Sequence, residues 1–147
     1  ADAVLRQFEV GVAIADTEAT GYNSVEFLND GSFLNVDEFS HDTQQRLLVR
    51  VQGMLNVERL LVESKPEHIT VDNVRFILER LRPNQTLEVG IGIESRNDFV
   101  REVCINKGIC IADFEAIVGA IAAMPIVFVA AGRTRNEPKL FSPAPPF

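Results

Sequence analysis

The amino-acid sequence predicts an α/β protein with a parallel sheet of about four strands joined by helices. The first observation is that segments of helical and strand periodicity alternate along the chain. The second is that the predicted strands begin near residues 24, 57, 87 and 125, a spacing of roughly 30–38 residues that is typical of a βαβ unit. Every α/β fold shares this pattern, so periodicity alone leaves open an open flavodoxin-like sheet or part of a barrel.

The first half of the chain predicts two helices around one strand. A helix over residues 2–15 is followed by a break at Gly21, a short strand over residues 24–28 and a turn at Asn29-Asp30-Gly31. A second helix over about residues 42–54 is capped by Ser40 or Asp42. The residues expected to face inward from the two helices are Val4, Leu5, Phe8, Val12, Ala15, Leu47, Leu48, Val51 and Leu55.

The second half repeats the strand–helix pattern. A strand over residues 57–63 precedes a helix that Thr70 caps, and a strand over residues 86–93 follows. The next helix is expected to open with a capping box at residues 95–98 and to close at Gly108. A helix over 112–123 and a strand over 125–130 complete the core. The apolar face of the helix before Gly108 is predicted to comprise Phe99, Val100, Val103 and Cys104, with Cys104 in the core and Cys110 in a similar position.

The composition predicts one α/β core over residues 1–131 and a proline-rich extended tail over residues 132–147, because four of the seven prolines lie in the last ten residues. The net charge of −7 argues against non-specific nucleic-acid binding, which needs Lys and Arg to neutralise phosphates. No apolar run is long enough to span a membrane. Two cysteines are too few for a disulfide framework, so reduced thiols and a cytoplasmic location are expected, with no metal ligand set.

Polar residues and glycines gather where the predicted strands end, which is where parallel α/β folds bind ligands. Gly31 and Ser32 follow the first strand, and Glu63 and Ser64 follow the second. The third strand carries Gly90-Ile91-Gly92 and ends in Glu94-Ser95. Strand glycines permit close approach of a ligand, and carboxylates suit a ribose diol or an amino group. The alternative is that Glu63 and Glu94 cap the helices that follow them.

Four segments, in order, resemble the radical S-adenosylmethionine enzymes, in particular their elongator-like and archaeosine-synthesis branch. The resemblance covers about residues 5–120 and is carried by residues 25–35, 61–67, 87–95 and 101–108. It implies that the sheet is part of a (βα)6 partial TIM-like barrel, with S-adenosylmethionine lying across the strand tips. It also leaves room for an RNA substrate of the kind that the parent family takes.

The resemblance assigns a part of the ligand to each strand tip. Gly31 and Ser32 would contact the methionyl amino group, and Glu63 and Ser64 would lie near the ribose. The strand that would shelter the adenine contributes Gly90, Ile91, Gly92 and Glu94. Arg101 is the expected partner of the methionyl carboxylate.

The chain departs from the family in one important respect. The family's CxxxCxxC loop, which holds a 4Fe–4S cluster, is absent, and residue 1 is expected to fall shortly after it. We therefore expect a radical-enzyme-like domain that retains a nucleoside-binding rim but cannot perform radical chemistry alone. The alternative is a small α/β binding or protein-interaction module without catalytic activity. A homo-oligomer that buries the edge at Val25 and Phe27, or the helix over 2–15, is expected because the first family strand is missing.

Overall fold

The structure is a computed structural model that describes residues 2–18, 21–29, 31–131 and 140–141. Four parallel strands lie side by side in chain order: β1 (Ser24–Phe27), β2 (Arg59–Glu63), β3 (Thr86–Gly92) and β4 (Ile126–Ala131). A two-residue strand, β5 (Leu140–Phe141), pairs antiparallel with β4. The predicted parallel α/β sheet is confirmed. The rest of the expected tail lies outside the described residues.

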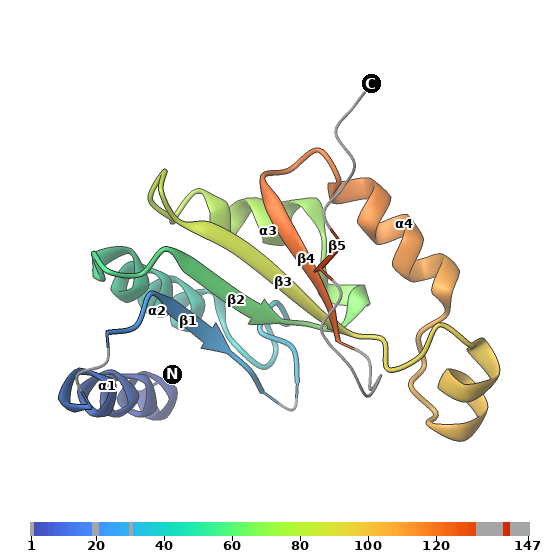
Figure 1. The fold of residues 1–147 in the computed structure, drawn as a ribbon, viewed down its shortest axis with the longest axis horizontal. Coiled ribbons are helices and arrows are strands. Elements are labelled where there is room, and N and C mark those ends of the chain that lie inside the picture. Colours follow the sequence, from blue (N-terminus) through green and yellow to red (C-terminus); the bar gives the residue numbers. More distant parts are fainter. Residues whose placement is uncertain (1, 19–20, 30, 132–139, 142–147) are drawn as a thin grey trace.

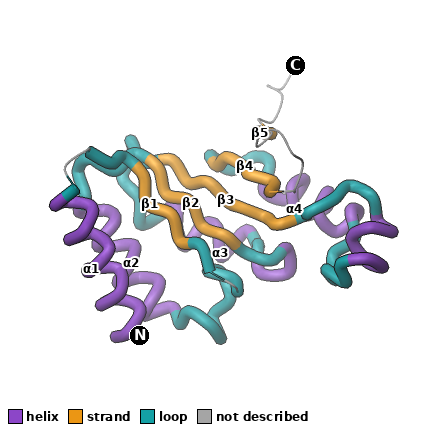
Figure 2. The backbone as a smooth tube through the Cα atoms, turned by 60° about the horizontal axis from the view of Figure 1, so that its bottom comes forward, coloured by secondary structure: helices purple, strands orange, loops and turns teal. Residues whose placement is uncertain are grey.

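Sequential strand order distinguishes between the two architectures that periodicity left open. A doubly wound sheet reverses its strand order at a switch point, whereas here each strand neighbours the next along the chain. Right-handed crossovers between such strands place the connecting helices on the same face. Figure 2 shows α2 (His41–Gly53) and α3 (Val71–Leu78) beneath one face of the sheet. Strands in chain order with their helices on one face are the arrangement found in a segment of a βα barrel.

Alternating side chains separate a buried face of the sheet from an open face. Toward the helices point residues that are at most 8% exposed: Leu60, Val62, Leu87, Val89, Ile91, Ile126 and Phe128. The residues between them point to the other face, where Leu61 and Glu88 are adjacent in register and Val127 follows on β4. On this open face Arg59 Nε lies 3.1 Å from Glu88 Oε1, at the amino end of the sheet.

Aromatic rings join α1 (Asp2–Thr17) to the β1 edge. The Phe8 and Phe27 ring centroids are 5.6 Å apart, Phe27 stacks on Phe33 at 4.9 Å, and Phe33 contacts Phe39 at 5.4 Å. Val4, Leu5, Phe8 and Val12 pack against the core, as the periodicity predicted. Figure 1 shows α1 beside α2, and Arg50 on α2 makes two hydrogen bonds to the Glu9 carboxylate on α1.

Two predicted helix caps are confirmed. Ser40 Oγ accepts from the Thr43 N–H at the start of α2, and Thr70 Oγ1 accepts from the Asn73 N–H at the start of α3. The prediction that Leu55 faces the core is wrong, because α2 ends at Gly53 and Leu55 is 83% exposed. Met54 adopts an extended conformation beyond the helix and takes the buried position instead.

The segment between β3 and α4 (Ile111–Ile121) differs most from the expected helix. Only Phe99–Cys104 is helical, in a π-helical turn, and Gly108 has the expected left-handed conformation. The predicted apolar face is turned outward: Phe99 is 64% and Val103 66% exposed. Cys104 and Cys110 are exposed as well, so the prediction that they lie in the core is wrong. Arg101 occupies the interior in their place, with no exposed surface.

A short 3₁₀ helix, Pro66–His68, follows β2 and was not expected from the sequence. Across the described ranges of the chain, no helix has both the length and the apolar character that crossing a membrane requires.

Candidate site at the carboxyl ends of the strands

Gly92 lies at the centre of a charged cluster where β3 ends. A Cβ atom placed on Gly92 would lie 3.3 Å from Lys107 Nζ, 3.5 Å from Glu94 Oε1 and 3.8 Å from Glu63 Oε1. Lys107 Nζ and Glu94 Oε1 are themselves 3.5 Å apart. Glu63 comes from the end of β2, Glu94 follows β3, and Lys107 returns from beyond the π-helical turn. Three chain segments thus place two carboxylates and one ammonium group around Gly92, which has no side chain of its own.

Glu94 adopts an uncommon backbone conformation beside this cluster. Its φ of 62° lies in the left-handed region, which costs a non-glycine residue on the order of 1–3 kcal/mol. The Ser95 N–H donates to the Ile93 carbonyl at 2.7 Å and so closes the tight turn around Glu94. The turn ends the strand and leaves the Glu94 carboxylate beside Lys107.

Gly90 is not explained by protein packing. A Cβ atom there would meet the Leu61 side chain and the Val62 carbonyl at 3.6 Å, which is ordinary van der Waals contact. Gly90 pairs with Glu63 in the sheet, and its carbonyl accepts from the Ser64 N–H. An alanine would therefore fit among the described residues, so packing within the chain does not require a glycine at this buried position next to Glu63.

The buried residues of the predicted site have more limited roles. Ile91 is 1% exposed on the helix-covered face, so only its backbone borders the open face. The Ser64 side chain is 2% exposed, and its hydroxyl has no hydrogen-bond partner among the described residues. A buried hydroxyl without a partner is uncommon, because leaving it unpaired costs free energy.

The loop after β1 is fastened to the loop after β2. The buried Ser32 donates its N–H to Glu38 Oε2 at 2.8 Å, and its hydroxyl accepts from the Lys65 N–H at 2.9 Å. The backbone hydrogen bond from Ser32 lowers the pKa of Glu38 below its ordinary value of 4.5, and the Asn35 amide adds to the effect. A Cβ on Gly31 would collide with the Glu38 carboxylate, so any other residue there would displace Glu38 from its hydrogen bond with Ser32.

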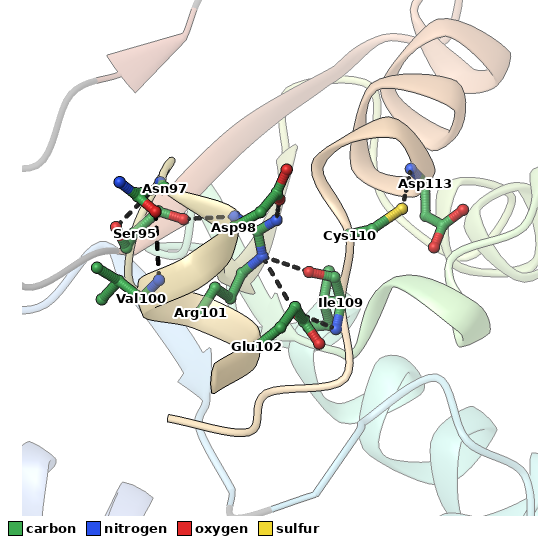
Figure 3. Close-up of polar contacts among 9 residues, drawn as sticks. All are labelled: Ser95, Asn97, Asp98, Val100, Arg101, Glu102, Ile109, Cys110 and Asp113. Atoms are coloured by element: carbon green, nitrogen blue, oxygen red, sulfur yellow. Dashed lines mark hydrogen bonds and ion pairs between the residues drawn. The ribbon is translucent and has the colours of Figure 1, made fainter. Parts of the chain in front are cut away.

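Arg101 has protein partners on every side (Figure 3). Its guanidinium donates to the Ser95 carbonyl at 2.7 Å and to the Ile109 carbonyl, pairs with Asp98, and lies 3.4 Å from Glu102 Oε1. These contacts close the segment from Ser95 to Ile109 on itself. A role for Arg101 toward a ligand carboxylate stays a prediction, and it would have to compete with these bonds.

The capping alternative finds little support in this region. Lys65 is the N-cap of the 3₁₀ helix after Glu63 and makes no side-chain cap bond, and Asp98 before the π-helical turn makes none either. Asn97 Oδ1 instead accepts from the Val100 N–H, so the expected capping box is not formed. Neither Glu63 nor Glu94 supplies the N-cap of the helix that follows it.

The structure brings most of the predicted residues to one rim. Glu63, Gly90, Gly92 and Glu94 surround the same part of the open face, and Ser64 borders it. Gly31 and Ser32 lie on the neighbouring loop, which contacts Lys65. Sequence reasoning missed Lys107. In the sequence, Lys107 is marked only by its place between Asn106 and Gly108. In the structure these two neighbours have positive φ and turn the chain back.

A second concave surface lies outside the predicted site. A groove of about 780 Å³ runs between α1 and α2 and is lined in part by Leu5, Val10, Val49 and Arg50. Val10 and Val49 are more than half exposed. None of the predicted site residues borders this groove.

The chain is similar to two archaeal proteins with a named function and to one archaeal protein without one. It is 36% identical over 103 residues to archaeosine synthase subunit beta of Thermococcus kodakarensis, covering 69% of this chain and 32% of that protein. It is 32% identical over 90 residues to archaeosine synthase subunit beta of Methanosarcina acetivorans, covering 61% of this chain and 26% of that protein. Uncharacterized protein MJ0550 of Methanocaldococcus jannaschii is 36% identical over 86 residues, covering 58% of this chain and 23% of that protein.

The chain thus spans a third or less of the length of these curated relatives. The similarity supports the expected relation to archaeosine synthesis. No protein-family model matches the chain, and no solved structure matches it at a significant level.

Proposed function

We propose that this chain contributes the S-adenosylmethionine-binding rim of a radical S-adenosylmethionine enzyme related to archaeosine synthase subunit beta. The observation that carries the proposal is the cluster of Glu63, Glu94 and Lys107 around Gly92 at the carboxyl ends of the strands. The similarity to archaeosine synthase subunit beta supports it. A site built from parallel-strand ends is also where this fold class binds its ligands.

The charges of the cluster suit this ligand. S-adenosylmethionine carries a sulfonium, an ammonium and a carboxylate, which gives a net charge of +1. Two carboxylates and one ammonium give the protein cluster a net charge of −1. Opposite net charges attract, and each charged part of the ligand has a counterpart of opposite sign in the cluster. S-adenosylhomocysteine lacks the sulfonium charge and is expected to bind more weakly.

The remaining assignments follow the resemblance. Glu63 would accept hydrogen bonds from the ribose diol, for which a carboxylate has the needed acceptor capacity. The buried Ser64 hydroxyl, which has no described partner, offers a further polar group near the ribose. Gly90 and Gly92 would allow the adenine to approach β3, and the loop at Gly31 and Ser32 would lie toward the methionyl amino group.

The residues present do not fit a 4Fe–4S cluster. Such a cluster takes cysteine thiolates as ligands, and the chain has two cysteines, both exposed in the segment around the π-helical turn. We therefore assign no radical step to these residues. The complete enzyme would act in the synthesis of archaeosine or a related modified nucleoside, with the cluster and the partner subunit supplied from outside this sequence.

Isothermal titration calorimetry of the 147-residue chain with S-adenosylmethionine tests the proposal. Glu63→Gln is expected to weaken binding by about 1–3 kcal/mol, because it removes a charged acceptor. The matched control is Glu58→Gln, which alters an exposed carboxylate next to the opposite end of β2 and should leave the affinity unchanged.

Absence of binding by the unmodified chain would contradict the proposal and favour the second candidate, an α/β interaction module without a nucleoside site. The observation that favours this candidate is the apolar groove between α1 and α2, where exposed Val10 and Val49 could contact another protein.

A further inference from the structure

The groove between α1 and α2 has the shape that a third helix would fill. Each helix lines it over two successive turns, with the same spacing of i, i+1, i+4 and i+5: Leu5, Arg6, Glu9 and Val10 on α1, and Gln45, Arg46, Val49 and Arg50 on α2. Residues at i and i+4 lie one above the other on a helix face. The groove therefore runs along both helices, which lie side by side in Figure 2. A helix packs into such a groove through its own ridges of side chains.

Apolar side chains in and beside the groove are left in contact with solvent. Val10 and Val49 are more than half exposed, and so is Ile14, one turn beyond Val10 on α1. Another side of α1 packs against the core through Phe8 and Val12, so the core does not require apolar side chains at the exposed positions. An apolar row on the outer side of an amphipathic helix is typical of a surface that another helix covers.

The groove is positively charged, although the protein is acidic. Three arginines and the single carboxylate of Glu9 line it, which gives a net charge of +2, whereas the whole chain has a net charge of −7. Asp42, whose carboxylate lies 3.8 Å from Arg46, does not line the groove, and the sum stays positive when it is included. The charge of this surface thus differs in sign from that of the protein as a whole.

These charges distinguish between the possible occupants. A two-fold contact centred on the groove would place the positive surface of one copy against that of another, and like charges across an interface repel. An RNA backbone is bound by cationic groups that neutralise its phosphates, but Arg50 is already bonded to the Glu9 carboxylate. The side chains between the arginines are valines rather than the aromatic rings on which bases stack. An acidic amphipathic helix matches both the apolar residues and the positive charge.

We propose that the α1–α2 groove docks a helix of another protein that carries large aliphatic residues on one face and aspartate or glutamate residues beside that face. The aliphatic residues cover Val10 and Val49, and the carboxylates pair with the guanidinium groups that line the groove, such as that of Arg6. None of the residues of the proposed ligand site borders the groove, so this docking role is separate from ligand binding. It also gives the second candidate function a partner of defined chemistry.

Fluorescence anisotropy with two synthetic helical peptides tests the charge requirement. Both peptides carry leucine at i, i+3, i+4 and i+7, but one has glutamate at the flanking positions and the other has lysine. The unmodified chain is expected to bind the glutamate peptide about tenfold or more tighter than the lysine peptide, and added salt should reduce the difference. Equal affinity for the two peptides, or no binding of the glutamate peptide, would overturn the proposal.

Two substitutions with matched controls locate the binding surface. Arg6→Glu should weaken binding of the glutamate peptide by about three- to tenfold, because a repulsion replaces an attraction. Arg96→Glu, at an exposed arginine after β3, changes the net charge equally and should have no effect. Val49→Asp should weaken binding about tenfold by removing an apolar contact, whereas Val36→Asp, on the loop after β1, should not. All four side chains are exposed, and circular dichroism checks that each variant folds.

Three results would assign the groove to something else and overturn the proposal. Equal losses in Arg6→Glu and Arg96→Glu would attribute the effect to the overall charge of the chain. A dimer of the unmodified chain that Val49→Asp dissociates would assign the groove to a second copy. Binding of a labelled single-stranded RNA that Arg6→Glu removes, without binding of the glutamate peptide, would make the groove a phosphate-binding surface. Absence of S-adenosylmethionine binding would change none of these readouts, so the docking role and the ligand site fail separately.

Discussion

Glu38 shows how one carboxylate can shape a loop beside the candidate site. It accepts the N–H of buried Ser32 and an amide N–H of Asn35, and its carboxylate occupies the space where a side chain at Gly31 would be. Ser32 in turn receives the Lys65 N–H. The loops after β1 and β2 are therefore coupled through three residues, although Glu38 itself is exposed.

The lowered pKa of Glu38 predicts a pH-dependent contribution to stability. Because the folded state favours the charged carboxylate, this contribution is complete above the ordinary value of 4.5 and is lost as the pH falls through the lowered pKa. Glu38→Gln is expected to reduce the free energy of unfolding at pH 7 by about 1 kcal/mol, the size of one hydrogen bond. The difference between the variant and the unmodified chain should shrink as the pH falls below 4.5 and passes through the lowered pKa of Glu38.

Urea unfolding at several pH values measures this difference. Glu67→Gln, on an exposed carboxylate of the nearby 3₁₀ helix, is the control and should change the pH profile little. A Glu38→Gln variant whose difference from the unmodified chain is the same at pH 7 and pH 3 would contradict the assigned role of Glu38.

At the scale of elements, the sequence is most informative where local chemistry and burial agree. The four parallel strands and the caps at Ser40 and Thr70 follow directly from alternation and hydroxyl preference. The turn over Phe99–Cys104 does not, because its apolar residues suggested a core-facing helix while the buried position went to Arg101. An arginine that donates hydrogen bonds to two backbone carbonyls across a loop leaves no periodic pattern in the sequence.

The residues of the candidate site also fall into those that the sequence predicts and those that it does not. Strand-end chemistry predicted Glu63, Gly92 and Glu94, because parallel strands bring their carboxyl ends to one rim. Lys107 could not be predicted in this manner, since it reaches Gly92 only through the loop that Arg101 closes. Local sequence patterns predict the residues that aligned strands place side by side. Residues that a loop brings back to the site can be identified only from the tertiary structure.

Gly90 in β3 offers a prediction that separates stability from binding. Gly90→Ala adds a Cβ in ordinary contact with Leu61, so the free energy of unfolding should stay the same or rise by about 0.4–1 kcal/mol through the unfolded chain. The same methyl group projects onto the open face beside Glu63 and should weaken S-adenosylmethionine binding. Thermal unfolding and calorimetry measure the two effects separately.

Gly119→Ala in α4 provides the control, because nothing lies within 4 Å of its Cβ position. Helix propensity predicts a gain of stability there with no effect on the ligand. If Gly90→Ala bound S-adenosylmethionine as well as Gly119→Ala does, the open face next to Glu63 would not be part of the ligand site.

At the scale of the whole molecule, the sheet has a covered face, an open face and an edge at β1. Phe8 of α1 packs on Phe27 from the helical side, but among the described residues no strand pairs with the outer edge of β1. An unpaired edge of a parallel sheet tends to recruit another chain. Two-fold dimers are the commonest oligomers, so we predict a homodimer that buries this edge or α1.

Light scattering at low micromolar concentration measures the mass of the assembly. A dimer mass is expected, and replacing Val25 with Lys on the edge strand should shift it toward the monomer. A monomer mass for the unmodified chain would mean that the β1 edge is satisfied within a single copy.

We propose that a nucleoside-linked amino acid binds on the open face around Gly92 at the carboxyl rim of the sheet. Titration of the isotope-labelled chain with S-adenosylmethionine, followed by amide NMR, tests it most directly. The largest shifts are expected at the residues of the cluster and its neighbour on β3: Glu63, Gly90, Gly92, Glu94 and Lys107. Shifts confined to Val10, Val49 and the other residues of the α1–α2 groove would contradict it.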